Sequence, residues 1–316
     1  MKRCLDLAQN AWPACRPNPM VGALLVHRDQ IIAEGYTSPY GGPHAEVKAI
    51  GGAPEDALTE STLYVSLEPC AHHGKTPPCV DLILEKGIPR VVIGCRDPFK
   101  EVDGRGIEKL RAAGLEVTVG VLEEECRWQN RRFMTFHEKK RPYVILKWAE
   151  SSDGYIDRQR EGGKASQISS AASSQQVHQW RADEMAILIG GRTARMDDPS
   201  LTTRLVSGPS PERFVWTSTD LPSESTLHRS GYKAVQATSV TEVLKELYDQ
   251  GMQSVLIEGG AEVHRQFLEE GLYDEVRRII GSGSLGKGVE APVIDGLPDT
   301  ETASGSDRIL TYLNTL

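Results

Sequence analysis

Short apolar runs rich in β-branched residues alternate with helix-like stretches in the first 120 residues, and this alternation restricts the fold more than any other feature. The stretches at 44–50, 79–87 and 106–114 have a helical pattern, and the last two end in glycine, the usual residue after a helix C-terminus. Alternating strands and helices predict an α/β protein. The expected strands are Val21–Val26, Ile31–Tyr36, Thr62–Leu67, Arg90–Cys95 and Leu115–Gly120.

A polar segment that ends in proline, His137–Pro142, separates this pattern from a second one of the same kind. Because 316 residues exceed a typical single domain, we expect two domains, over residues 1–141 and 142–316. In the second half, amphipathic helices at 240–251 and 261–271 again stop at glycine. The expected strands there are Tyr143–Ser151, Ala186–Gly190, Arg213–Trp216, Tyr232–Ala237 and Ser254–Gly259.

The charge and cysteine content restrict the partners and the compartment. The formal net charge is −8 and no long basic run occurs, which argues against a nucleic-acid partner. The N-terminal residues lack the continuous apolar core of a signal peptide or a membrane span. Six cysteines in a chain this long do not indicate a disulfide framework, so we expect a reducing, cytoplasmic compartment in which clustered cysteines bind metal or act in catalysis.

One constellation in the first half has the residue types of a catalytic zinc site. His44 and Glu46 are followed by Cys70, in the sequence Glu-Pro-Cys at a strand end, and by Cys79. One imidazole and two thiolates suit zinc, and three protein ligands leave the fourth position for a water whose pKa the metal lowers. Glu46 is then the proton shuttle rather than a ligand. This pattern is the signature of zinc-dependent nucleobase deaminases.

Eight residues separate the two cysteines, whereas the general signature has two between them. The insert AHHGKTPP is basic and rich in proline. We expect it to contact a substrate, with Lys75 as a point charge for a phosphate and His72 as a hydrogen-bond partner. His73 is the weaker candidate. A structural zinc module is the alternative, and it requires His72 or His73 as a fourth ligand.

The sequence resembles the bifunctional riboflavin biosynthesis deaminase/reductases. The resemblance is carried by PNPMVG (17–22), GGPHAEV (41–47), SLEPCAHHGKTPPC (66–79), GRGIEKL (104–110), RPYVILKWAES (141–151), DDPSLTTR (197–204) and IEGGAEVH (257–264), in the order of the family. It implies an N-terminal cytidine-deaminase-like three-layer α/β/α domain followed by a C-terminal dihydrofolate-reductase-like α/β domain. It also implies deamination of 2,5-diamino-6-ribosylamino-4(3H)-pyrimidinone 5′-phosphate, and then reduction of the ribosyl group to a ribityl chain with NADPH.

The resemblance implies roles for individual residues of the deaminase half. His44, Cys70 and Cys79 would bind zinc and Glu46 would carry the proton. The other implied contacts are to the substrate: Asn18 would hold the pyrimidine, and His72 and Lys75 would contact the ribose phosphate.

In the reductase half the implied residues fall into three groups. Lys147, Asp197 and Glu258 would be catalytic. Arg181, Leu201 and Arg204 would bind the substrate, and two arginines suit a phosphate or ribose oxygens. The implied cofactor-binding residues, which follow strands or precede a helix, are Ser169, Gly190, Gly191, Thr193, Gly259 and Gly260.

The sequence departs from the family pattern at three places that bear on function. Thr37 stands where the family often has a histidine, and Gln167 stands where the reductases usually have a tryptophan. An aspartate that usually follows the strand at Arg213–Trp216 is missing. These departures leave a second hypothesis open, in which the C-terminal half is a degenerate, non-catalytic domain beside an active deaminase.

A third hypothesis is a deaminase of nucleic acid or free nucleosides. The acidic net charge disfavours nucleic acid, and Lys75 favours a small phosphorylated substrate. We therefore expect a small-molecule pyrimidine phosphate as the substrate, no nucleic-acid or membrane partner, and zinc and NADPH as cofactors. By analogy with the family we expect a homo-oligomer, either a dimer or a tetramer.

Overall fold

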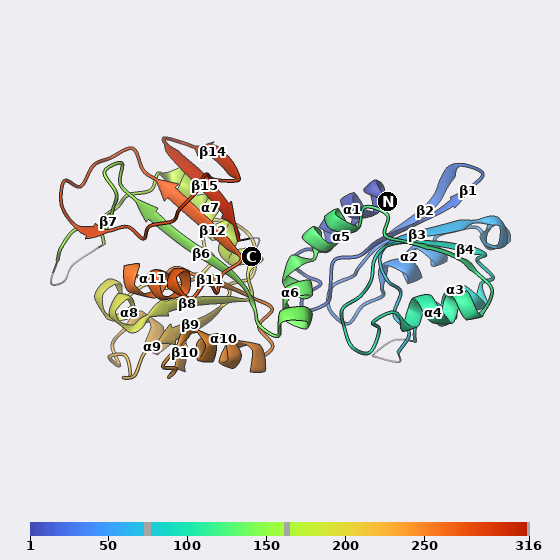
Figure 1. Ribbon diagram of the computed structural model, residues 1–316, viewed down its shortest axis with the longest axis horizontal. Coiled ribbons are helices and arrows are strands. Elements are labelled where there is room, and N and C mark those ends of the chain that lie inside the picture. The colour runs from blue at the N-terminus through green and yellow to red at the C-terminus, as the bar shows by residue number, and fades with distance from the viewer. Residues whose placement is uncertain (73–76, 161–164, 315–316) are drawn as a thin grey trace. The chain divides into compact units, whose positions relative to one another are not determined.

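The computed structural model describes residues 1–72, 77–160 and 165–314 (Figure 1). The chain divides into two compact units, Met1–Lys139 and Lys140–Leu316. The polar segment expected to be a linker begins inside a helix, because α6 (Arg131–Lys139) continues to the last residue of the first unit. Among the described residues, no helix has both the length and the apolar character that crossing a membrane requires.

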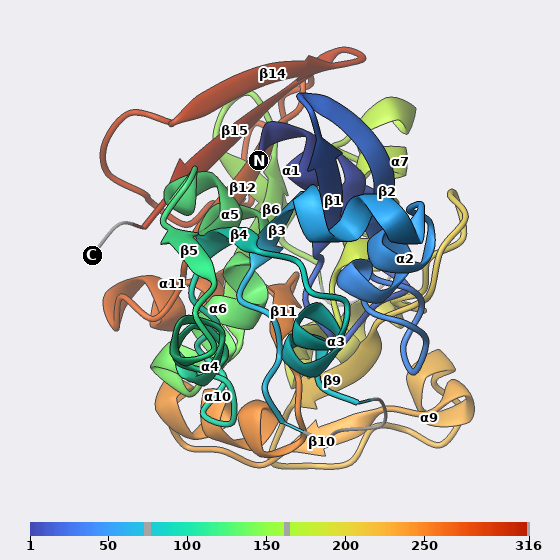
Figure 2. The same cartoon turned by 90° about the vertical axis from the view of Figure 1, so that its right-hand side faces the viewer.

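The first unit is built on a five-stranded sheet in the order β2-β1-β3-β4-β5 (Figure 2). β1 pairs antiparallel with β2 and β3, whereas β3, β4 and β5 are parallel. The apolar strand residues are buried, as the β-branched runs predict. The strands are β1 (Gly22–His27), β2 (Gln30–Tyr36), β3 (Thr62–Leu67), β4 (Arg90–Cys95) and β5 (Glu116–Val119).

Helices cover both faces of this sheet, so the unit has the three layers that we expected. One face carries a row of helices in mutual contact, which are α2 (Ala45–Gly51), α3 (Cys79–Glu85) and α4 (Arg105–Ala112). The other face carries α1 (Lys2–Ala8) and α5 (Glu123–Gln129). Short 3-10 helices, η1 (Gln9–Ala11) and η2 (Glu55–Glu60), complete the unit. The helices α1, α5 and α6 were not predicted from the sequence.

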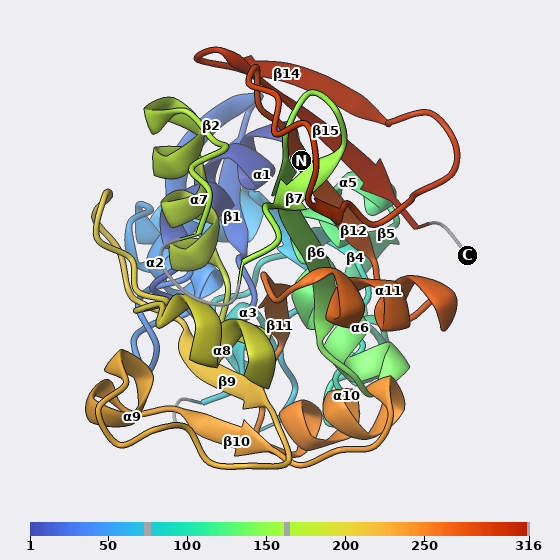
Figure 3. The same cartoon turned by 90° about the vertical axis from the view of Figure 1, so that its left-hand side faces the viewer.

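The second unit has an eight-stranded sheet in the order β10-β9-β8-β11-β6-β12-β15-β14 (Figure 3). The strands from β10 to β12 are parallel, and β15 and β14 close one edge with antiparallel pairing. The strands are β6 (Tyr143–Glu150), β8 (Ala186–Gly190), β9 (Glu212–Trp216), β10 (Lys233–Val235), β11 (Ser254–Ile257), β12 (Glu275–Ile280), β14 (Thr300–Ser304) and β15 (Asp307–Leu313).

Two helices, α10 (Val240–Asp249) and α11 (Ala261–Glu269), bury their apolar faces against one side of this sheet. The other side packs against α7 (Ala171–Asp183) through Trp180, and against α9 (Thr226–Ser230) through Leu227. A separate two-stranded ribbon joins β7 (Tyr155–Asp157) to β13 (Val289–Glu290). The short helix α8 (Gly191–Asp197) follows β8 directly.

Candidate active sites

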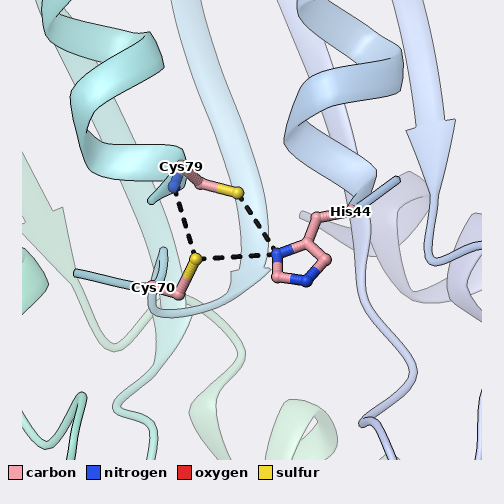
Figure 4. A group of neighbouring side chains, drawn as sticks. All are labelled: His44, Cys70 and Cys79. Carbon is pink, nitrogen blue, oxygen red and sulfur yellow. Dashed lines mark hydrogen bonds between the residues drawn. The ribbon is translucent and has the colours of Figure 1, made fainter. Parts of the chain in front are cut away.

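Three side chains from separate segments of the first unit meet at the C-terminal end of β3. His44 is the residue before α2, Cys70 lies just beyond β3, and Cys79 begins α3. His44 Nδ1 lies 3.6 Å from Cys70 Sγ and 3.3 Å from Cys79 Sγ (Figure 4). The Cys79 amide also donates a hydrogen bond to Cys70 Sγ at 3.3 Å. The structure therefore brings together the three predicted metal ligands.

The donor atoms of this group fit zinc. All three lie within 4.8 Å of one another, which a single tetrahedral ion can bridge. In the described part of the chain no fourth histidine, cysteine or carboxylate joins them. A site with two thiolates, one imidazole and an open position has the composition of a catalytic zinc centre, whereas a structural zinc module needs a fourth protein ligand. His73 lies outside the described residues.

Glu46 lies in the first turn of α2, two residues from His44, and is 4% exposed. Burial, and then the negative charge of the neighbouring Cys70, raise the pKa of Glu46 to about 7 in the metal-free protein. A bound cation would favour the carboxylate and lower this pKa. A buried carboxyl group beside the metal ligands is suited to the role of a proton shuttle.

Glu68 holds the zinc-binding loop in place, a role that the sequence analysis missed. Its buried carboxylate accepts hydrogen bonds from the backbone N–H groups of Gly104 and Gly106 at 3.0 and 2.9 Å, and of Asp97 and Ile107 at 3.3 and 3.1 Å. These donors belong to the start of α4 and to the loop after β4. Glu68 therefore ties the segment that carries Cys70 to the next strand and helix. The sequence feature that could have indicated this role is the position of Glu68, directly before Pro69-Cys70 at a strand end.

The remaining deaminase predictions have different outcomes. Asn18 is half-buried in the loop before β1, and its backbone N–H donates a hydrogen bond to the Cys15 carbonyl. The His72 ring packs edge-on against Phe99 with the ring centroids 5.5 Å apart, and its buried Nδ1 has no hydrogen-bond partner among the described residues. Lys75 lies outside the described residues. The substrate contacts of all three predicted residues stay predictions.

Thr37, which stands where the family often has a histidine, is buried and has a structural role. Its hydroxyl accepts a hydrogen bond from the Val21 amide at 3.0 Å and donates to the Pro19 carbonyl at 3.2 Å. Met20 lies between Pro19 and Val21, and the Asn130 side chain forms hydrogen bonds with both its backbone N–H and its carbonyl. Thr37 and Asn130 thus fix the backbone that follows Asn18.

A cavity of about 2040 Å³ in the second unit contains nearly all of the predicted reductase residues. It lies at the C-terminal ends of the parallel strands, where ligands bind in open α/β sheets. Its lining includes Lys147, Ser169, Arg181, Gly190, Gly191, Thr193, Asp197, Arg204, Glu258, Gly259 and Gly260. Leu201 is the exception among the predicted residues, since its side chain is 3% exposed and packs in the core with Ile187 and Val215. Any substrate contact of Leu201 must therefore come from its backbone.

Two cations surround one carboxylate in this cavity. The Arg181 guanidinium, from α7, contacts both oxygens of Glu258 at 2.8 Å, and Lys147 Nζ, from β6, lies 3.8 Å from the same carboxylate. Burial alone would raise the pKa of Glu258, but Arg181 and Lys147 outweigh it and hold the pKa at about 2. Burial, helped by the nearby Arg181, lowers the pKa of Lys147. Glu258 therefore stays ionised near neutral pH.

A buried histidine on α7, which the sequence analysis did not single out, joins this cluster. His178 Nδ1 accepts a hydrogen bond from the Arg204 amide at 3.0 Å. Burial, and then the charges of Arg181 and Arg204, lower the pKa of His178 to about 4, so the ring is neutral near pH 7. The sequence feature that could have indicated His178 is its spacing from Arg181, since residues three apart lie on one face of a helix.

Asp197, at the end of α8, forms an ion pair with Arg160, which also bonds Asp157 at 2.6 Å. The predicted catalytic carboxylate is therefore balanced by an arginine of the chain, and no sequence argument singled out Arg160. Asp198 has a left-handed backbone and ends α8.

The predicted cofactor glycines are needed for packing within the protein itself. A Cβ atom at Gly259 would lie 2.6 Å from the Gly190 nitrogen, and one at Gly191 would lie 2.6 Å from the Thr217 hydroxyl oxygen. At Gly260 it would meet the Thr193 hydroxyl at 3.0 Å, and that hydroxyl accepts the Gly260 amide hydrogen bond. The β8 and β11 ends are therefore in direct backbone contact at the cavity wall.

Thr217 is the first residue after β9, the strand after which the expected aspartate is missing. Its hydroxyl oxygen lies 3.3 Å from the Thr219 amide and donates to the Thr219 carbonyl at 2.8 Å, which closes a tight turn after β9. Gln167 is exposed and lines the cavity in place of the tryptophan.

Comparisons with known proteins agree with this arrangement of two sites. Residues 1–95 match the family model of the cytidine and deoxycytidylate deaminase zinc-binding region, and residues 142–311 match the RibD C-terminal domain. The riboflavin biosynthesis protein RibD of Aquifex aeolicus is 36% identical over 92% of this chain and 88% of its own. The chain belongs to the RibD family. This confirms the resemblance predicted from the motifs and the order of a deaminase and a reductase domain.

Solved RibD structures extend the similarity to the whole chain. A diaminohydroxyphosphoribosylaminopyrimidine deaminase/5-amino-6-(5-phosphoribosylamino)uracil reductase from Thermotoga maritima is 36% identical, with a TM-score of 0.85 over 98% of this chain and 96% of its own. RibD of Acinetobacter baumannii is 30% identical, with a TM-score of 0.89 over 99% of this chain and 97% of its own. As a family member, the chain is a bifunctional deaminase and reductase of riboflavin biosynthesis.

Proposed function

We propose that the first unit deaminates 2,5-diamino-6-ribosylamino-4(3H)-pyrimidinone 5′-phosphate and that the second unit reduces the product's ribosyl group to a ribityl chain with NADPH. The observation that carries this proposal is the presence of two complete sites in one chain. One has a zinc ligand set beside the buried Glu46, and the other has a large basic cavity around Lys147 and Glu258.

In the deaminase site, zinc held by His44, Cys70 and Cys79 would supply a nucleophile by lowering the pKa of a bound water. Glu46, buried beside His44, would carry a proton from that water to the amine that leaves as ammonia. Lys75 and His72 of the insert bind the ribose phosphate, and Asn18 orients the pyrimidine.

In the reductase site, NADPH would supply the hydride, and the protein positions the ribose C1′ and provides the matching proton. Lys147 is our candidate for the proton donor, because burial lowers its pKa and Glu258 holds it beside the cavity. Arg181 forms an ion pair with Glu258, whereas the Arg204 side chain has no carboxylate partner among the described residues. Arg204 therefore binds the substrate phosphate, and Asp197 sets the position of the neighbouring loop through Arg160.

A purified, zinc-loaded sample tests both halves. We expect ammonia from the pyrimidine phosphate and none from cytidine or from transfer RNA. We also expect NADPH oxidation only when the deaminated intermediate is added or formed. Ammonia release without NADPH oxidation would support a degenerate reductase domain, and activity on cytidine alone would overturn the substrate assignment.

We also propose a cytoplasmic location and a homo-oligomeric state, dimer or tetramer. The six cysteines are all unpaired, which suits a reducing compartment. The edge position of β14 and the nearly full exposure of Leu297, at 92%, leave surface for a second copy. Sedimentation equilibrium tests the assembly, and a monomer at micromolar concentration would contradict it.

A further inference from the structure

One end of the reductase cavity carries an arginine that the proposed chemistry does not use. Arg195 extends from α8 toward the turn after β9, where its guanidinium lies 3.1 Å from the Thr219 hydroxyl and 3.4 Å from the Thr217 hydroxyl. Arg195, Thr217 and Ser218 all line the cavity. Polar groups of one helix and one strand end therefore surround the same corner.

The charge of Arg195 is not neutralised by the protein. In the parts of the chain that the structure describes, no carboxylate forms an ion pair with it, whereas Arg160 and Arg181 in the same cavity are paired with Asp197 and Glu258. Its observed partners are neutral hydroxyls. An arginine with free donors at a cavity wall is suited to a phosphate, which it can bind with two parallel hydrogen bonds.

The turn after β9 supplies further hydroxyl groups, and its acidic residue, Asp220, forms no ion pair with Arg195 among the described residues. The Thr217 hydroxyl is used within the turn, whereas the Thr219 hydroxyl lies 3.1 Å from the Arg195 guanidinium and Ser218 is exposed at the cavity wall. Gly191 allows this closeness, because a Cβ there would lie 2.7 Å from Thr217 Cβ and 3.1 Å from an Arg195 nitrogen. The corner is thus built from residues of α8 and β9 that pack against each other.

The position of this corner matches one end of a dinucleotide. Lys147 lies within β6 and Glu258 directly follows β11. Two strands, β8 and β11, separate β9 from β6 in the sheet. Three strand spacings correspond to about 14 Å. A cofactor whose nicotinamide lies beside Lys147 would therefore place its adenosine half near β9 and β10, whose following residues, Trp216–Ser218 and Gln236–Thr238, also line the cavity.

We infer that Arg195, together with the hydroxyls of Ser218 and Thr219, binds the 2′-phosphate of NADPH and so selects NADPH over NADH. This inference rests on the proposed reductase function. The 2′-phosphate carries nearly two negative charges at pH 7, as a phosphomonoester does, and is the group that distinguishes the two cofactors. Arg192 is the rival candidate, since it lines the same cavity and is exposed like Arg195, but among the described residues no hydrogen bond joins it to the turn after β9.

Calorimetric titration of the full-length protein with NADP⁺ and NAD⁺ tests this inference without requiring turnover. We expect Arg195→Ala to weaken NADP⁺ binding about tenfold to a hundredfold, since a charge-assisted hydrogen bond is lost, and to change NAD⁺ binding less than about twofold. Arg195→Lys should retain part of the preference. Arg213→Ala is the matched control, because Arg213 lies on β9, bonds Ser230, and is absent from the cavity wall.

The possible outcomes separate this inference from the proposal on which it rests. If the wild type prefers NADP⁺ and Arg195→Ala keeps that preference, the inference is wrong and the reductase assignment stands. The same holds if Arg192→Ala, and not Arg195→Ala, abolishes the preference. If the wild type binds neither nucleotide, the reductase assignment fails and this inference fails with it.

Discussion

Arg181 and Glu258 form a two-armed ion pair, in which Arg181 Nε and Nη2 each lie 2.8 Å from a different carboxylate oxygen. The pair connects α7 to the end of β11, and Lys147 approaches the same carboxylate at 3.8 Å. All three side chains are at most 12% exposed. The cluster therefore links α7, β6 and β11 at the cavity wall and also places charged groups there.

Replacing Glu258 with glutamine should destabilise the second unit by about 3–5 kcal/mol, because Arg181 and Lys147 would be buried without a counter-charge. Differential scanning calorimetry of the full-length protein measures this. Glu301→Gln is the matched control, since Glu301 pairs with Arg308 on the surface and should contribute no more than about 1 kcal/mol. Equal effects of the two substitutions would contradict the account of a buried cluster.

The stability of the second unit should depend on pH through His178. Its pKa is lowered to about 4 in the folded protein, whereas an unfolded histidine titrates near 6.5. Between these values the unfolded chain binds the extra proton, so stability should fall as pH decreases from about 6.5 to about 4. His178→Asn should make the unfolding free energy less dependent on pH in this window. An unchanged slope in urea titrations at several pH values would show that His178 does not contribute.

Glu68→Gln should weaken zinc binding about tenfold or more, since partners of metal ligands typically contribute this much. A glutamine cannot accept all four backbone hydrogen bonds that the carboxylate accepts. Competition with a chromophoric chelator gives the affinity. Glu60→Gln, at an exposed position of the same unit, should leave the zinc affinity unchanged. Equal zinc affinities of Glu68→Gln and the wild type would show that Glu68 does not support the metal site.

Removing the metal should separate the two activities. After treatment with a chelator, we expect no ammonia release, because His44, Cys70 and Cys79 bind the only metal that the account requires. NADPH oxidation should continue when the deaminated intermediate is supplied. Added zinc should restore ammonia release, and a loss of both activities would indicate that the metal also maintains the second unit.

The sequence predicted the parts of the fold that carry strong local patterns. The apolar runs became β1, β3, β4, β6, β8 and β11, and glycine marked the ends of the helices as expected. The helices α1, α5 and α6 were missed, as were β12, β14 and β15. Their exposed and buried positions mix charged and apolar residues, as in Glu275–Ile280, where a buried Arg277 and Glu275 bond each other and hide the strand pattern.

The metal ligands were predictable because zinc restricts both residue type and spacing. The supporting contacts were not, because they join residues far apart in the sequence. Glu68 bonds amides 29 to 39 positions away, and Arg181 bonds a carboxylate 77 positions away. Leu201 shows another limit of the motif, which names a position but not which of its atoms could contact a substrate, because the side chain lies in the core and leaves only the backbone.

The most direct test measures ammonia release and NADPH oxidation together in wild type, Glu46→Gln and Lys147→Ala. Our account predicts that Glu46→Gln abolishes ammonia release while zinc stays bound and NADPH oxidation with added intermediate continues. Lys147→Ala should abolish only NADPH oxidation. Normal deamination by Glu46→Gln, or loss of both activities in either variant, would contradict the central claim that one chain carries two separate sites.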